Sequence, residues 1–92
     1  MKQFEITITG RGGHGSRPDL AINPIDCFAG VYNMLSQLGG FQVTKVDGGK
    51  TGNVIPNAVT VWCGFAGDRA VLEQVLENTC SIYHCTGELR EV

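Results

Sequence analysis

His14 is the residue whose type and setting most favour chemistry. It stands in the segment Gly10-Arg11-Gly12-Gly13-His14-Gly15, directly after a strand-like stretch. An imidazole can move a proton, donate a hydrogen bond or bind a metal ion. Because glycine adopts backbone conformations closed to other residues, we expect the loop to project His14 outward. The alternative is an ordinary surface histidine in a glycine-rich turn.

Asn53 is the second candidate, and it follows another glycine cluster. It lies between Gly48-Gly49-Lys50-Thr51-Gly52 and Val54-Ile55-Pro56-Asn57. Its amide could reach into a site, while we expect Val54 and Ile55 to anchor the segment to the core. The alternative is an ordinary turn asparagine. Isolated basic side chains are usually solvated, but four could bind a carboxylate: Arg11, Arg17, Lys45 and Lys50.

Two other kinds of site are disfavoured. The loop contains Gly-x-Gly-x-x-Gly, but a dinucleotide fingerprint must open a helix, and the next helix start is near Pro24. Cys80 and His84 are four residues apart, with Cys85 adjacent, so a helix would bring them together. A structural zinc site, however, needs four ligands. Nothing indicates secretion, so we expect reduced and mostly buried thiols at Cys27, Cys63, Cys80 and Cys85.

Hydrophobic periodicity predicts the elements that position these residues. Alternation predicts strands over residues 2–9 and 58–65, and a strand over 41–46 whose alternation slips at Lys45. Asn23 and Pro24 are a typical helix start. The predicted apolar stripe of this helix, which Gly39-Gly40 ends, is Ile25, Phe28, Ala29, Tyr32, Leu35 and Leu38.

A second helix is predicted to begin after Asp68, with Gly87 as its stop and a final strand over residues 88–92. Its predicted apolar stripe is Val71, Leu72, Val75, Leu76, Thr79 and Tyr83. The resulting order is β-α-β-β-α-β, the ferredoxin-like arrangement of the α+β class. We therefore predict one domain, residues 1–92, with a four-stranded antiparallel sheet and two helices on one face.

This topology makes the first and last strands neighbours and leaves the second strand at an edge. The two chain ends then emerge side by side, as in a domain inserted into a longer host chain. Charged residues make up 17% of the 92 residues, against a usual share of about 25%. We therefore expect a partner to cover part of the domain's surface. The net charge of −2 and the absence of a long apolar run indicate no nucleic-acid partner, no membrane span and a cytoplasmic location.

Several motifs in this order resemble one family. They are Gly10-x-Gly12-Gly13-His14-Gly15-Ser16-x-Pro18, Asn23-Pro24-Ile25, Gly48-Gly49 and Asn53-Val54-Ile55-Pro56-Asn57. The chain resembles the dimerisation (lid) domain of the zinc-dependent aminoacylase, carboxypeptidase G and hippurate hydrolase family of metallopeptidases. The N-acyl-amino-acid amidohydrolase branch is the most similar. The resemblance covers nearly the whole chain.

The resemblance implies a larger parent hydrolase that acts on N-acyl amino acids or small peptides. Its two zinc ions would lie in a separate catalytic domain, whose His-x-Asp and Glu-Glu motifs are absent here. We therefore expect no metal site, no cofactor and no catalysis in this chain alone. The alternative is a free-standing ferredoxin-like module that binds a small ligand or regulates another protein, because this fold hosts many functions.

The resemblance also implies roles for single residues. His14 matches a histidine that reaches into the partner subunit's active site and holds the scissile carbonyl and the oxyanion formed from it. Asn53 and Gly13 match positions that contact substrate. The implied partners are a second copy of the chain and the parent's catalytic domain. We expect the homodimer to form edge to edge, with Tyr32, Ser36 and the outer face of residues 41–46 near the seam.

Overall fold

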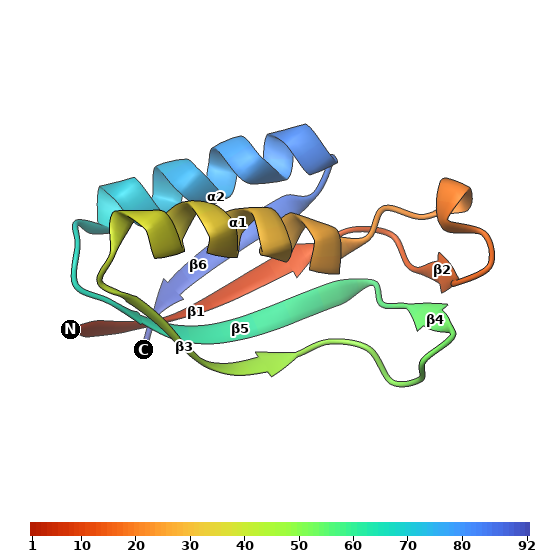
Figure 1. Ribbon diagram of the computed structural model, residues 1–92, viewed down its shortest axis with the longest axis horizontal. Helices are drawn as coiled ribbons and strands as arrows, with labels where there is room; N and C mark the ends of the chain where they lie inside the picture. The colour runs from red at the N-terminus through yellow and green to blue at the C-terminus, as the bar shows by residue number, and fades with distance from the viewer.

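The computed structural model describes all residues, Met1 to Val92. Its main sheet is antiparallel, with the strand order β3-β5-β1-β6. Two helices, α1 (Pro24–Leu38) and α2 (Arg69–Tyr83), lie side by side on one face of this sheet (Figure 1). The predicted α+β class and element order are thereby confirmed. The strand bounds are β1 (Lys2–Thr9), β3 (Phe41–Asp47), β5 (Ala58–Phe65) and β6 (Thr86–Glu91).

The two central strands supply the floor of the core. β1 and β5 alternate as predicted, so that Ile6 faces Val61 across the sheet and both side chains are fully buried. Burying such a side chain contributes about 1.5–3 kcal/mol to folding. Thirteen hydrophobic residues from both helices and both central strands form one contiguous cluster. This cluster makes the sheet and helices a rigid platform.

The first helix begins as predicted but buries only part of the predicted stripe. The Asn23 side chain caps it by accepting a hydrogen bond from the Ile25 amide at 3.0 Å. The buried residues are Pro24, Cys27, Val31 and Leu35. Ile25, Tyr32 and Leu38 instead stay 41%, 48% and 57% exposed. Leu35 of the predicted stripe is buried and Phe28 packs against the core, but the other predicted positions are exposed. The prediction was wrong at those positions because α1 carries two apolar stripes, and only packing decides which one faces the sheet.

The second helix is capped by Asp68, whose carboxylate accepts from the Ala70 amide at 2.9 Å. Its buried stripe is Leu72, Leu76 and Cys80, whereas Val71 and Tyr83 of the predicted stripe are exposed. The helix ends at Tyr83, and His84 follows in the left-handed conformation, with φ of 61°.

The prediction that Gly87 stops this helix was wrong, because Gly87 lies in β6. A Cβ atom there would lie 2.8 Å from Leu76 Cγ and 2.9 Å from Cys80 Sγ. The missing side chain therefore lets β6 approach α2 closely. β6 pairs antiparallel with β1, which confirms that the first and last strands are neighbours.

β3 forms the predicted edge of the sheet and pairs only with β5. Its register shifts between Val43 and Lys45, where the sequence alternation slips. The extra residue, Thr44, donates its hydroxyl to the Trp62 carbonyl at 3.1 Å. Lys45 then lies over the Trp62 ring, 4.5 Å from its centroid. The bulge thus shifts the pairing register of the second half of β3 without ending the strand.

All four cysteines are free, and three of them are buried. Burial raises the pKa of Cys63 to about 11 and also raises the pKa of Cys27, Cys80 and Cys85. These thiols therefore stay protonated near neutral pH, which suits packing rather than nucleophilic chemistry. The chain contains no helix of the length and apolarity that a membrane span requires.

Candidate functional site

Two segments that are distant in sequence meet beyond the end of the main sheet. β2 (Gly13–His14) pairs antiparallel with β4 (Val54–Ile55), with His14 opposite Val54. Figure 1 shows this pair at the end of the molecule opposite the two termini. We call residues 10–22 and 48–57 the arm. The structure therefore brings the two candidate segments of the sequence together.

Residues 10–19 contain short regular elements, although four glycines and a proline in this segment favour irregular structure. Besides β2, one turn of 3-10 helix, η1, covers Pro18–Leu20. Local sequence could not show β2, because its hydrogen-bonding partner lies about forty residues further along the chain. The pairing continues past β2, where the Gly15 amide donates to the Asn53 carbonyl at 2.8 Å.

The arm is held by hydrogen bonds rather than by a core. Arg11 and Ile22 exchange two backbone hydrogen bonds of 2.8 Å. The Gly12 amide donates to Asn57 Oδ1 at 2.9 Å. No residue of the arm is buried. The segments of the arm are thus held to each other by polar contacts that do not involve the hydrophobic core.

The loop glycines serve close approach, not unusual backbone angles. No residue of the segment 10–22 has a positive φ. The expectation that its glycines adopt backbone conformations closed to other residues was therefore wrong. A Cβ at Gly12 would lie 2.5 Å from the Ile55 carbonyl oxygen, and one at Gly15 3.1 Å from that of Asn53. The two segments can pair this closely only because side chains are missing. Gly13 differs, because a Cβ there would meet only Ala21, at 3.5 Å.

His14 is exposed on the arm, as predicted, and one of its ring nitrogens is already engaged. Its Nδ1 lies 3.1 Å from the backbone nitrogen of Ser16 and 2.7 Å from the Ser16 hydroxyl. Nε2 has no hydrogen-bond partner within the chain. The atom available to another molecule is therefore Nε2.

Asn53 is also exposed and lies next to β4. Its Oδ1 accepts a hydrogen bond from the Thr51 hydroxyl at 2.9 Å, which leaves the Nδ2 amine free to donate. Val54 does not anchor the segment to the core as expected, because it is 49% exposed and pairs with His14 instead. The arm therefore presents two exposed nitrogens, His14 Nε2 on β2 and Asn53 Nδ2 beside β4, that no group of the chain occupies and that could each donate to a carbonyl oxygen or an oxyanion.

The four candidate basic residues differ in their surroundings. Arg17 makes two hydrogen bonds to Asp19, of 3.1 and 3.0 Å. That pairing raises the pKa of Arg17 and lowers the pKa of Asp19. Lys45 is placed over Trp62, whereas Lys50 lines a hollow of about 480 Å³ beside the arm. Of these three residues, only Lys50 lines this hollow.

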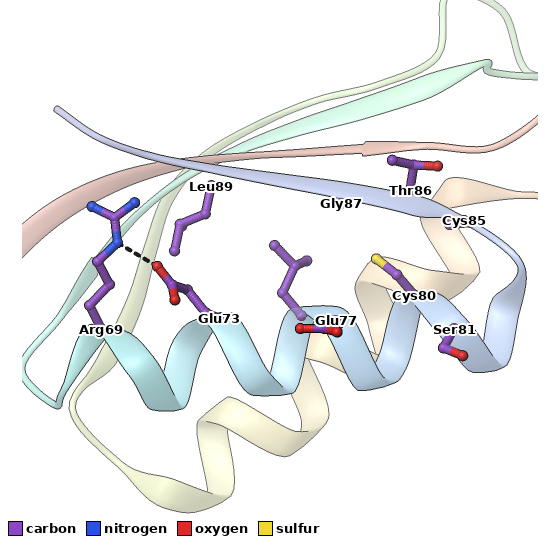
Figure 2. A pocket seen from close by; sticks show the side chains of 10 residues that line it. Arg69, Glu73, Glu77, Cys80, Ser81, Cys85, Thr86, Gly87 and Leu89 are labelled. Carbon is purple, nitrogen blue, oxygen red and sulfur yellow. Dashed lines mark hydrogen bonds and ion pairs between the residues drawn. The ribbon is translucent and has the colours of Figure 1, made fainter.

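The largest hollow of the molecule lies elsewhere, between α2 and β6. Figure 2 shows this groove of about 550 Å³, with the Arg69–Glu73 ion pair of 2.7 Å at one end and Cys80 towards the other. Burial raises the pKa of Cys80, and no histidine lines the groove to act as its base. The groove therefore lacks an activated nucleophile, and no residue of the arm lines it.

The chain's own residues do not fit a zinc site. No group of three or more His, Cys, Asp or Glu side chains lies close enough together to hold a metal ion. Cys80 Sγ packs 3.7 Å from Cys27 Sγ inside the core, whereas His84 is exposed at the end of α2. The spacing of Cys80, His84 and Cys85 therefore does not produce a ligand set.

The platform and the arm together define an α+β accessory domain with its polar groups displayed at one end. The family model of the peptidase dimerisation domain matches residues 1–79. The chain therefore belongs to the peptidase dimerisation domain family, found in amidohydrolases and peptidases. This confirms the family that the glycine-rich loop and the Asn53 segment indicated.

Known proteins of related sequence and structure are much longer. An IAA-amino acid hydrolase ILR1-like 2 from Arabidopsis thaliana is 28% identical over 94% of this chain and 23% of its own length. A hydantoinase/carbamoylase family amidase from Burkholderia multivorans superposes with a TM-score of 0.80 at 19% identity, over 99% of this chain and 26% of its own. A tripeptidase from Staphylococcus aureus gives 0.75 at 19% identity, over 99% and 28%. The chain thus spans about a quarter of the length of these relatives.

Proposed function

We propose that this domain is the dimerisation and lid domain of a zinc-dependent amidohydrolase or peptidase that acts on N-acyl amino acids or small peptides. The family membership supports the hydrolase class. The name of the Arabidopsis relative, an amino acid conjugate hydrolase, supports an N-acyl amino acid as substrate. The zinc ions would belong to the catalytic domain of the parent, since this chain has no ligand set for them.

The observation that carries the proposal is the pairing of β2 with β4. It brings His14 on β2 next to the segment of Asn53, which directly precedes β4, and leaves His14 Nε2 and the Asn53 amine free to donate hydrogen bonds. When an amide is attacked, its carbonyl oxygen gains negative charge. Donors placed in advance stabilise that charge more than they stabilise the substrate, which lowers the barrier. His14 would hold the oxyanion, and Asn53 and Gly13 would contact the substrate.

The position of the arm supports action across a dimer. The chain ends lie together, with the Val92 amide bonded to the Gln3 carbonyl at 2.9 Å. The arm is at the opposite end of a domain 39 Å long (Figure 1). In a longer parent chain, the connections to the catalytic domain would leave from the end away from the arm. His14 would then reach the partner's active site.

The β3 edge is the surface best suited to join two copies. The exposed stripe of α1, which includes Tyr32 and Leu38, runs beside this edge, and Val46 on β3 is 50% exposed. Tyr32 stacks edge-on against Phe41 of β3, with ring centroids 6.1 Å apart. The opposite edge carries charged residues instead: Glu88, Arg90 and Glu91. Two β3 edges joined about a two-fold axis would form an eight-stranded sheet.

Replacing His14 in the full-length parent tests the proposed role. His14→Ala removes the donor, and loss of one such donor typically lowers turnover by about a hundred- to a thousand-fold. The zinc content and the thermal unfolding midpoint should stay unchanged, because His14 is exposed and contacts no core residue. Turnover within a factor of two of the wild type would instead identify His14 as a plain surface histidine.

A further inference from the structure

Ser16 makes a two-point contact with the ring of His14. Its backbone nitrogen and its hydroxyl both lie within hydrogen-bond distance of the same ring atom, Nδ1, at 3.1 and 2.7 Å. The contact is local, because the Arg17 amide donates to the His14 carbonyl at 2.9 Å and closes a tight turn around Ser16. The ring is therefore held against its own turn.

This contact determines which ring nitrogen carries the proton. A backbone N–H can only donate, so Nδ1 must accept from Ser16 and hold no proton of its own. In a neutral imidazole the single proton then resides on Nε2. The Ser16 hydroxyl is left to donate to Nδ1 as well. The outward nitrogen of His14 is thus a donor and not an acceptor.

We propose that Ser16 is the positioning residue that fixes His14 as an Nε2–H donor aimed away from the arm. The catalytic consequence rests on the proposed function, in which Nε2 donates to the oxyanion. The tautomer itself does not, because it follows from the contact within this chain. With the opposite tautomer, Nε2 would present a lone pair to the oxyanion and repel it.

The two contacts of Ser16 can be separated by substitution. Ser16→Ala removes the hydroxyl and keeps the backbone N–H, so it should loosen the ring without changing the fold. Ser16→Thr keeps the hydroxyl and should restore its effect. Ser81→Ala is a matched control, because Ser81 is an exposed serine on α2, distant from the arm.

Nitrogen-15 NMR of this chain reads the tautomer directly at a pH where the imidazoles are neutral. We expect His14 to show protonated Nε2 and a hydrogen-bonded Nδ1. In Ser16→Ala the Nδ1 signal should move towards that of an unbonded ring nitrogen, while Ser16→Thr and Ser81→Ala should leave it in place. A protonated Nδ1 in the wild type, or an Nδ1 signal indifferent to Ser16→Ala, would overturn the inference.

Turnover of the full-length parent then separates this inference from the proposed function. We expect Ser16→Ala to lower kcat about tenfold, the value of roughly one hydrogen bond, with KM nearly constant and with recovery in Ser16→Thr. In a His14→Ala background, Ser16→Ala should have no further effect, since it acts only through His14. An equal loss in both backgrounds would contradict positioning. If His14→Ala leaves turnover unchanged while the NMR signals are as expected, the proposed function is refuted and the inference about Ser16 stands.

Discussion

The platform and the arm of this domain are built by opposite means. The platform buries thirteen hydrophobic side chains between one sheet face and two helices. The arm buries none and depends on backbone pairing between segments that glycine allows to approach. This difference separates stability from function, because the hydrophobic core lies in the platform while the free donors His14 and Asn53 lie on the arm. Substitutions in the two regions should therefore separate folding from activity.

The largest effect, on the stability of the fold, is expected from shortening a buried side chain in the platform. Leu72 is fully buried on the inner face of α2, so Leu72→Ala should lower the free energy of unfolding by about 2–5 kcal/mol. Urea denaturation of this chain followed by circular dichroism measures the change. His14→Ala is the matched arm variant and should stay within about 0.5 kcal/mol of the wild type. Equal losses in both variants would show that the arm is part of the folding core.

A smaller but more selective effect is expected from a change in the arm. Gly12→Ala places a methyl group 2.5 Å from the Ile55 carbonyl oxygen, so β2 and β4 must move apart. A misplacement of about 1 Å can cost roughly a hundred-fold in rate, and we expect that loss in kcat of the parent. The unfolding midpoint should change little. Gly13→Ala is the matched control for strand separation, because its Cβ has room at 3.5 Å. The backbone NMR shifts of Val54, on the opposite strand, should move more in Gly12→Ala than in Gly13→Ala.

The smallest of the three effects is expected at the β3 edge, the surface that we propose joins two copies of the domain. Tyr32→Ala removes an exposed aromatic beside the β3 edge and should weaken dimerisation about tenfold or more. Ile82→Ala is the control, since Ile82 is 73% exposed but lies on α2. Sedimentation equilibrium of both variants and the wild type gives the dissociation constants. Equal weakening by Ile82→Ala would place the interface on another face.

The sequence predicted most of the platform because its signals are local. Alternation in β1 and β5, the caps at Asn23 and Asp68, and the slip at Lys45 all correspond to observed elements. Of the buried residues of α1 only Leu35 was predicted, because two stripes of the same helix are apolar and the choice between them depends on packing against the sheet. Gly87 was misassigned as a helix stop, because its close contact with Leu76 is tertiary.

The candidate site was predicted in part. His14 and Asn53 were found from their motifs, and the structure brings their segments together. The pairing of β2 with β4 gave no signal of its own, because two-residue strands are too short to show periodicity. Ser16 was overlooked for a different reason. Its contact with Nδ1 depends on the turn closed by His14 and Arg17, which only the backbone geometry reveals.

The proposal that His14 acts across the dimer is tested most directly by mixing two inactive parent variants. One carries His14→Ala, and the other lacks the general base of its catalytic domain. After subunit exchange, a mixed dimer pairs one intact catalytic domain with one intact His14 from the other subunit. We expect activity to return, with one of the two sites working in each mixed dimer. A mixture that stays as inactive as its components, although exchange is demonstrated by mass, would contradict it.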